Sequence, residues 1–159
     1  MIKPSPANPG KREIDERLAR FERICRDAGI RLTHQRMEVF RAVAETGDHP
    51  DAETVLGRVR RRLPGVSLDT VYRALWLLTD LGLVRTLGPS RERTRFDANL
   101  GRHHHFVCTQ CGMTRDFVSE ELDALKPPAS VDGLGQADEV HVEVRGICHA
   151  CSKKTKTDR

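Results

Sequence analysis

Long apolar segments are missing from this sequence. It has no run of about 18 apolar residues, and its first 30 residues contain no apolar stretch of the kind that a secretory signal requires. By these criteria the protein is neither membrane-spanning nor secreted, and we expect it in the cytoplasm. Internal repeats and low-complexity tracts are missing as well.

Aromatic side chains are scarce. The 159 residues include five Phe, one Trp and one Tyr, and hydrophobic residues make up 38% of the chain. This length allows one ordinary domain or two small ones, each with a lean core. A small domain with a lean core gains most from a metal that holds it together. The net charge of +4 is compatible with a nucleic-acid binder but does not identify one.

Four of the five cysteines form two Cys-x-x-Cys pairs, Cys108/Cys111 and Cys148/Cys151. In a chain without a secretory signal, this pattern favours metal binding over disulfides. The pairs are separated by 36 residues, so a folded element must bring them together. Four thiolates make a closed tetrahedral shell that suits a structural Zn²⁺. The fifth cysteine, Cys25, falls on an apolar helical stripe, and we interpret it as a small buried side chain.

The first half has the pattern of a winged helix-turn-helix. Residues 1–12 hold three prolines and no apolar period, which predicts a disordered arm. Apolar residues at helical spacing then predict four helices, one from Glu13 and three that follow the capping residues Thr33, Asp51 and Ser67. A β-hairpin follows, with strands at 83–87 and 93–97 and a turn at 88–90. We place this domain at 13–97 and a hinge at 98–102.

The second half predicts a small unit of mixed structure at 103–151. Strands are expected at 103–109 and 113–117, a short helix at 119–125, and a strand over the alternating segment 139–144. A basic tail at 152–159 completes the chain. The fold class is therefore α+β, with a winged-helix domain followed by a small α/β domain.

A recognition helix contacts base edges through its first turns, and here the fourth helix begins at Ser67. Tyr72 offers a ring and a hydroxyl, Arg73 offers a fork for guanine or phosphate, and Ser67 and Thr70 can bond to phosphate oxygens. Asp69 suits phosphates poorly, and either stabilises the helix N-terminus or accepts a hydrogen bond from cytosine. Non-specific attraction is assigned to a set of arginines, although such a run is often only a solvated helix face: Arg58, Arg60, Arg61, Arg62, Arg91, Arg93 and Arg95.

A second metal site is indicated by His103 and His105, which project from the same face of a strand while His104 points away. Asp97, Asp116 and His49 are candidate partners, and three imidazoles with two carboxylates suit Fe²⁺ or Mn²⁺. The triplet of histidines also fits incidental surface decoration. We expect no metal role for His34, His141 or His149. Two rival interpretations are an iron oxygenase and a zinc-stabilised protein-interaction module without DNA affinity.

Several motifs together resemble the ferric uptake regulator family. They are Thr33-His-Gln-Arg36, His49-Pro50, the segment Ser67–Arg73, Arg95-Phe-Asp97, the segment His103–Cys111 and Cys148-His-Ala-Cys151. The resemblance runs from about Glu13 to Cys151. It implies a dimeric, metal-dependent transcription regulator, not an enzyme, with an N-terminal winged helix and a C-terminal dimerisation domain. It also implies that His49, Asp97, His103, His105 and Asp116 form the regulatory site.

Two positions make the sequence most similar to the peroxide-sensing PerR group. Zinc-sensing relatives typically have Cys where this chain has Asp97, and iron-sensing relatives usually have Glu in place of Asp116. The resemblance then implies a repressor of operator DNA in which peroxide oxidises His49 or His103 at bound Fe²⁺. The alternative is an iron-uptake regulator that responds to Fe²⁺. Apart from the metal and hydrogen peroxide, no small molecule is expected as a partner. Arg102 stands where some relatives have a further metal-binding His, so no third site is predicted.

Overall fold

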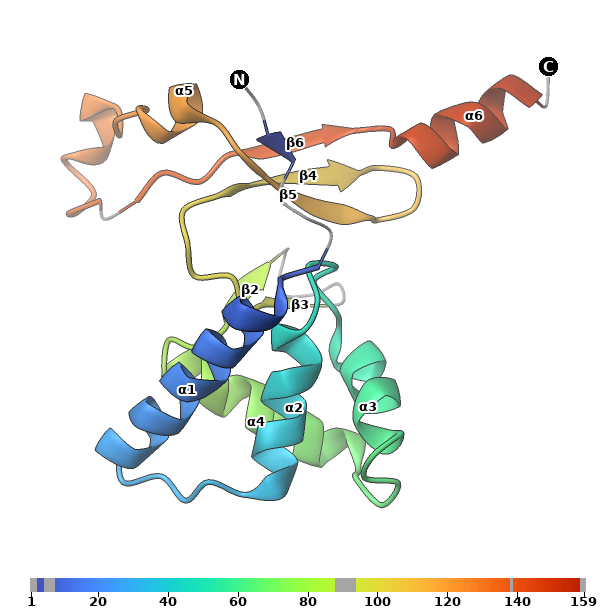
Figure 1. Ribbon diagram of the computed structural model, residues 1–159. Helices are drawn as coiled ribbons and strands as arrows, with labels where there is room; N and C mark the ends of the chain where they lie inside the picture. Colours follow the sequence, from blue (N-terminus) through green and yellow to red (C-terminus); the bar gives the residue numbers. More distant parts are fainter. Residues whose placement is uncertain (1–2, 5–7, 88–93, 138, 158–159) are drawn as a thin grey trace. The chain divides into compact units, whose positions relative to one another are not determined.

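The computed structural model describes residues 3–4, 8–87, 94–137 and 139–157. The chain divides into two compact units, which we call the helical unit (Pro6–Leu100) and the sheet unit (Met1–Ser5 with Gly101–Arg159). The division falls within the segment 98–102 where a hinge was expected. Figure 1 shows the helices and strands of both units.

Four helices build the helical unit, and side-chain caps set where three of them begin. Thr33, Asp51 and Ser67 each accept a hydrogen bond from the backbone N–H three residues ahead, which satisfies a donor that the first helical turn leaves free. Gly29 and Gly82 have positive φ angles just past the ends of the first and fourth helices, a conformation that glycine adopts readily. The helices are α1 (Lys11–Asp27), α2 (His34–Ala44), α3 (Ala52–Arg60) and α4 (Leu68–Asp80).

Apolar residues at helical spacing meet in one core. Phe21 of α1 stacks on Phe40 of α2 with ring centroids 4.8 Å apart, and both rings are buried. Leu75 and Leu78 of α4 and Phe96 add large side chains that are also buried. Each such side chain stabilises the fold by roughly 1.5–3 kcal/mol. Cys25 belongs to this core, and burial raises the pKa of its thiol.

A two-stranded antiparallel sheet follows the helices and forms the wing. Strand β2 (Arg85–Leu87) pairs with β3 (Arg95–Asp97), while the expected turn at 88–90 lies outside the described residues. The backbone N–H of Phe96 donates to the Pro50 carbonyl over 3.0 Å, and the Arg95 guanidinium donates to the His49 carbonyl over 3.1 Å. These bonds fix β3 against the loop that precedes α3.

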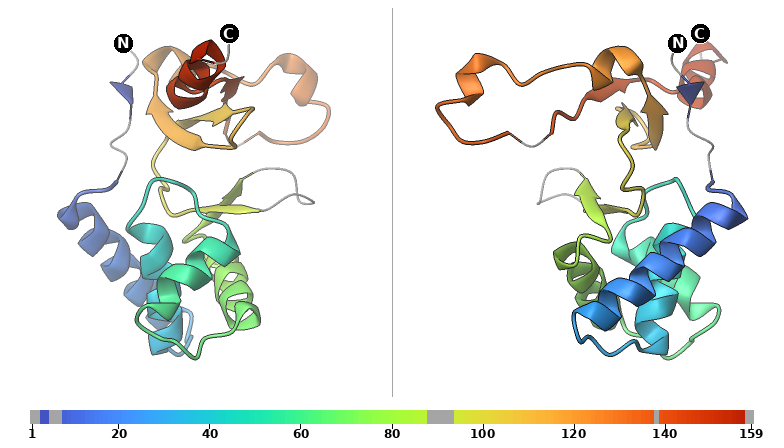
Figure 2. Two further views of the ribbon diagram at one scale, coloured as in Figure 1. Left: turned by 90° about the vertical axis from the view of Figure 1, so that its right-hand side faces the viewer. Right: turned by 60° about the vertical axis from the view of Figure 1, so that its left-hand side comes forward.

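The sheet unit contains a four-stranded sheet in the order β1-β5-β4-β6. Strands β4 (His104–Cys108) and β5 (Thr114–Val118) are antiparallel and joined by a tight turn, whereas β6 (Glu143–Gly146) runs parallel to β4. The short helix α5 (Glu120–Asp123) follows β5, and a segment with the 3₁₀ helix Ala129–Val131 projects from the sheet before β6 (Figure 2). The α+β fold class is confirmed.

The structure differs from expectation at three places in this unit. Lys3–Pro4 forms the edge strand β1 against β5, within the arm that was expected to be disordered. β6 begins at Glu143 although the alternating pattern starts at Glu139, because its ladder with β4 starts at the pair His105–Glu143. Residues His149–Thr157 form helix α6, which extends into the segment expected to be a basic tail.

The sheet unit has almost no hydrophobic core. Among the described residues, the hydrophobic cluster lies wholly in the helical unit, and the buried apolar side chains of the sheet unit are Cys108 and Cys148. The buried apolar side chains in the described part of this unit are therefore cysteines and not aliphatic or aromatic residues. No helix in the described part of the chain is long and apolar enough to cross a membrane.

Candidate metal centres and recognition helix

The parallel pairing of β4 with β6 brings the two cysteine pairs together. Cys108 ends β4 and is paired with Gly146 of β6, so Cys148 follows two residues after that pairing. The turn between β4 and β5 carries Cys111, and α6 carries Cys151. The sulfur atoms of the four cysteines all lie within 4.8 Å of one another. The β4–β6 ladder is therefore the folded element that brings the two separated cysteine pairs together.

Backbone donors prepare this cluster for a cation. The Cys148 N–H donates to the Cys108 sulfur over 3.3 Å. This bond, with further backbone N–H groups of the turn, lowers the pKa of Cys108 from 9.0 to about 6. Hydrogen bonding with Cys148 and Cys111 raises the pKa of Cys151 to about 12, so that thiol keeps its proton in the metal-free cluster.

The donor set fits a closed tetrathiolate site. The Cys111 and Cys148 sulfurs are 3.8 Å apart, far beyond the roughly 2.05 Å of a disulfide bond, and none of the four cysteines forms a disulfide. Four converging sulfurs leave no position for a substrate, which is typical of structural rather than catalytic zinc. Cys108, Cys111, Cys148 and Cys151 would hold such an ion.

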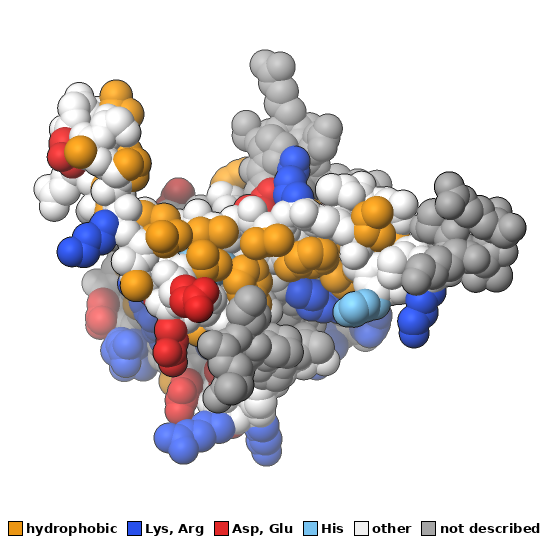
Figure 3. Space-filling view, turned by 90° about the horizontal axis from the view of Figure 1, so that it is seen from above, with side chains coloured by type: hydrophobic (Ala, Val, Ile, Leu, Met, Phe, Trp, Pro, Cys, Tyr) orange, Lys and Arg blue, Asp and Glu red, His pale blue; other side chains and the backbone are white. Residues whose placement is uncertain are grey.

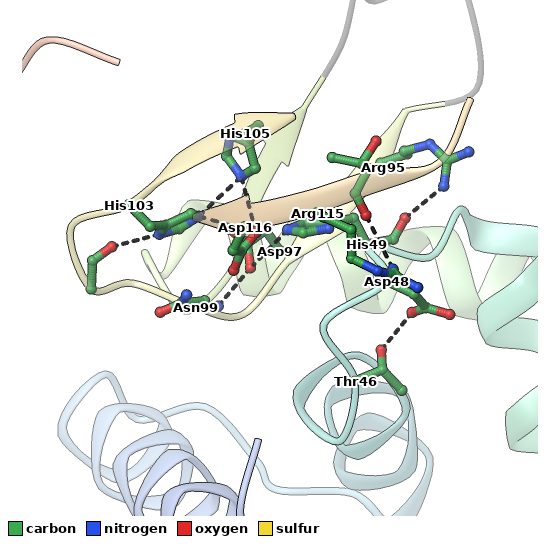
Figure 4. Close-up of polar contacts among 12 residues, drawn as sticks. Thr46, Asp48, His49, Arg95, Asp97, Asn99, His103, His105, Arg115 and Asp116 are labelled. Carbon is green, nitrogen blue, oxygen red and sulfur yellow. Dashed lines mark hydrogen bonds and ion pairs between the residues drawn. The ribbon is translucent and has the colours of Figure 1, made fainter. Parts of the chain in front are cut away.

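A second cluster in the sheet unit joins His103, His105 and Asp116. The antiparallel register places His105 directly opposite Asp116, and strand alternation puts His103 and His105 on the same side. The Nε2 atoms of the two imidazoles are 2.9 Å apart, and Asp116 Oδ1 lies 3.7 Å from His103 Nε2 and 3.6 Å from His105 Nε2. All three side chains are buried. The arrangement is shown in Figure 4.

The tautomer of His103 follows from its other hydrogen bond. Its Nδ1 lies 2.8 Å from the carbonyl oxygen of Gly101, which can only accept, so Nδ1 carries the proton in the neutral ring. Nε2 then presents its lone pair toward His105 and Asp116. A backbone carbonyl that fixes the ring in this way is the usual outer partner of a metal-ligating histidine.

In the helical unit, His49 and Asp97 form a second group of donors. His49 Nε2 lies 3.8 Å from Asp97 Oδ1, and both side chains are buried. The Asn99 backbone N–H donates to Asp97 Oδ1 over 2.7 Å (Figure 4). His49 has a φ of +51°, the only positive φ of a non-glycine residue in the described segments. Such a conformation is held by surrounding structure, here the Arg95 bond to its carbonyl, and often marks a functional site.

His104 points away from His103 and His105, as the strand pattern predicted, but it is not an exposed residue. It is completely buried, and the Val142 N–H donates to its Nδ1 over 3.3 Å. The proton of the neutral ring therefore sits on Nε2, which faces Asp123 Oδ1 at 3.2 Å. Arg102 Nε lies 3.3 Å from the same oxygen. This cluster fastens α5 to the sheet, a role that the sequence did not reveal.

The residues expected to contact DNA lie at the start of α4. Val71, Leu75 and Leu78 face the core, which leaves Asp69, Tyr72 and Arg73 exposed. Ser67 Oγ accepts from the Thr70 N–H over 3.1 Å and lies 2.9 Å from Thr70 Oγ1. The Ser67 oxygen therefore already caps α4 through one of its lone pairs, in addition to the phosphate contact expected of it. Sequence reasoning missed Trp76, which is 46% exposed one turn beyond Tyr72 and meets Phe96 edge-on at 5.9 Å.

Several arginines expected to attract DNA also hold the helical unit together. Arg58 donates to the Ala42 carbonyl, and Arg60 donates to the Val66 carbonyl. Arg62 pairs with Glu38 over 3.0 Å, and this carboxylate raises the pKa of the Arg62 guanidinium. Arg91 and Arg93 lie outside the described residues. The arginine run is therefore more than a solvated helix face.

A winged-helix unit with an exposed recognition helix, together with thiolate and imidazole–carboxylate clusters, defines a metal-dependent DNA-binding regulator. The chain belongs to the ferric uptake regulator family, whose model matches residues 27–144. It is a transcription regulator and not an enzyme, as the resemblance implied.

Among curated proteins, the peroxide-responsive repressor PerR of Staphylococcus epidermidis is 30% identical over 143 residues, covering 89% of this chain and 94% of its own. Among solved structures, the ferric uptake regulator of Helicobacter pylori has a TM-score of 0.72 and 21% identity, covering 87% of this chain and 93% of its own. A zinc uptake regulator in complex with zinc and DNA has a TM-score of 0.62 and 26% identity, covering 90% of this chain and 97% of its own.

Proposed function

We propose that this protein is a metal-dependent repressor that senses peroxide, and that one regulatory ion is bound jointly by His49, Asp97, His103, His105 and Asp116. The observation that carries this proposal is the pair of buried donor groups, two side chains in the helical unit and three in the sheet unit. Neither group alone fills the shell of Fe²⁺ or Mn²⁺, which prefer imidazole and carboxylate donors.

Because the proposed ligands come from both units, ion binding is thermodynamically coupled to the arrangement of the two units. The ion favours whichever arrangement lets all five side chains reach it, and DNA favours the arrangement that presents the recognition helices. A coupling of a few kcal/mol would suffice, because each 1.4 kcal/mol or so changes affinity tenfold. When the ion is bound, operator DNA is contacted by Ser67, Thr70, Tyr72 and Arg73.

We further propose that the protein acts as a homodimer through the sheet unit. Proteins of this family bind DNA operators as dimers. The sheet face opposite His103 and His105 has a groove of about 770 Å³ whose lining includes Phe106, Phe117 and Val144. Val144 and Ile147 are 41% and 51% exposed, and hydrophobic side chains form a band on the surface seen in Figure 3. An apolar face of this kind is suited to a second copy.

Peroxide sensing rests on the likeness to PerR and on the presence of Asp116 in the donor set. Bound Fe²⁺ would supply the electron-transfer chemistry that activates hydrogen peroxide. One peroxide oxygen would then be inserted into the C2–H bond of the His49 or His103 imidazole and the other would leave as water, so the ring would lose two electrons and peroxide would gain them. The oxidised ring would be a poorer ligand, so His49 or His103 would no longer hold the ion and DNA would be released.

Mass spectrometry tests this proposal. Full-length protein loaded with zinc is incubated with Fe²⁺ or Mn²⁺, exposed to hydrogen peroxide and digested. We expect one added oxygen on the peptide that carries His49 or His103 in the Fe²⁺ sample only. Peptides with the exposed residues His34 and His149 serve as internal controls. Equal oxidation with Mn²⁺, or none with Fe²⁺, would instead favour a regulator that only measures iron.

A further inference from the structure

The exposed side of the recognition helix carries an ion pair between Asp69 and Arg73. The Arg73 Nη2 atom is in direct contact with Asp69 Oδ2, one helical turn away, and the two side chains are 80% and 67% exposed. The carboxylate therefore sits beside the guanidinium that we assign to DNA, and within the first turn of α4.

Two ordinary explanations for Asp69 fit the structure poorly. It does not cap the helix, because the Ser67 side chain already accepts the Thr70 N–H, and as an exposed acid in the first turn it stabilises the helix N-terminus only slightly. An exposed pair of this kind also stabilises a helix only slightly. Against these small benefits stands a cost, because a carboxylate brought into the major groove approaches phosphates and the acceptor atoms of guanine and thymine.

This electrostatic cost is offset where a base presents a hydrogen-bond donor to the carboxylate. Cytosine presents its N4 amino group in the major groove, and a carboxylate oxygen accepts from it. The Arg73 fork matches O6 and N7 of guanine, and contact with Asp69 restricts the guanidinium to fewer orientations. A carboxylate that fits one base and repels the others gives specificity by rejection as well as by attraction.

We propose that Asp69 is a specificity-determining residue that, together with Arg73, selects a cytosine next to a guanine in the operator. This inference rests on the proposed DNA-binding function, and adds to it the base chemistry that the helix recognises. Asp69 improves sequence preference at the expense of overall affinity, because its charge repels the phosphates of any DNA and only cytosine offsets that repulsion with a hydrogen bond.

The test uses full-length protein loaded with zinc and Mn²⁺, and a pool of randomised DNA duplexes from which bound sequences are selected and read. Affinities are then measured for the selected site and for the same site with the cytosine replaced by thymine. We expect the wild-type protein to prefer cytosine by at least about fivefold. In Asp69→Ala the preference should fall close to one, and in Asp69→Asn it should move toward adenine, which an amide contacts through N6 and N7.

Asp80→Ala is the matched control, because it removes the same charge from an exposed position at the last residue of α4. It should tighten non-specific binding without changing the base preference. An Asp69→Ala variant that keeps the wild-type preference would overturn the role of Asp69 while leaving Mn²⁺-dependent operator binding intact. A wild-type protein that selects no sequence with Mn²⁺ would overturn the proposed function itself, and the specificity with it.

Discussion

Single residues determine whether each cluster can hold an ion. In the sheet unit, the Gly101 carbonyl sets the His103 tautomer and the strand register sets Asp116 opposite His105. In the thiolate cluster, backbone N–H groups prepare Cys108 as a thiolate. The side chains are thus oriented by the chain's own hydrogen bonds, which reduces the rearrangement that binding requires.

Asp116→Asn tests the imidazole–carboxylate cluster directly. The amide has the same shape but lacks the charge and is a poorer ligand for Mn²⁺. Loss of an outer partner of a metal ligand already costs about 10–100-fold in affinity, so loss of a direct carboxylate should weaken Mn²⁺ binding by at least about tenfold. Calorimetric titration of zinc-loaded protein gives the value. Glu121→Gln, an exposed carboxylate in α5, should bind Mn²⁺ as the wild type does.

The affinity of the thiolate cluster for zinc should depend on pH in a defined direction. Zinc replaces thiol protons, and Cys151, with a pKa of about 12, still holds its proton at neutral pH. Apparent affinity should therefore rise with pH through the range 6–9. Below about 6 it should fall more steeply, because Cys108 then becomes protonated as well. Competition with a chromophoric chelator measures this, and a flat profile would show that the cluster is already fully deprotonated.

Residue patterns predicted part of this chemistry. The Cys-x-x-Cys spacing identified the four sulfurs, and strand alternation identified His103 and His105, because both signals are local. The positive φ of His49 is held by Arg95, 46 residues away, and Arg58 donates to the carbonyl of Ala42, 16 residues away. No spacing rule encodes those contacts.

Helices α2, α3 and α4 begin where a side chain can accept a hydrogen bond from a backbone N–H, and these starts could be predicted from the sequence. Thr33, Asp51 and Ser67 were expected as caps, and the helices start one residue after each. The limits of β6 were not readable, because a strand exists only where its partner pairs with it. Its alternating pattern extends beyond the residues that β4 pairs with.

The cap of α4 gives a stability prediction. Ser67→Ala removes the acceptor for the Thr70 N–H and should lower the free energy of unfolding of the helical unit by about 1 kcal/mol. Ser67→Asn should cost much less, since Asn caps as well as Ser. Denaturant unfolding followed by helical circular dichroism distinguishes the variants. Equal stability of Ser67→Ala and wild type would mean that the cap contributes nothing.

At the scale of the molecule, the two units are stabilised by different means. The helical unit has a hydrophobic core built from all four helices and the wing. In the described part of the sheet unit, buried apolar side chains are limited to Cys108 and Cys148, so an ion held by the four thiolates would take the place of a core.

Removal of zinc should therefore affect the units unequally. After chelation, we expect amide hydrogens of β4, β5 and β6 to lose protection from exchange, while those of α1 to α4 keep most of it. Hydrogen exchange read by mass spectrometry resolves the two regions, and re-addition of zinc provides the control. Uniform loss of protection would indicate one cooperative unit, and unchanged β4 would indicate that the sheet needs no ion.

We propose that one ion is bound by side chains of both units. A Mn²⁺ titration of zinc-loaded His49→Ala decides this, because the variant leaves His103, His105 and Asp116 intact in the other unit. We predict one Mn²⁺ per chain for the wild type and at least about tenfold weaker binding for both His49→Ala and His105→Ala. Wild-type Mn²⁺ affinity in His49→Ala would contradict the shared site.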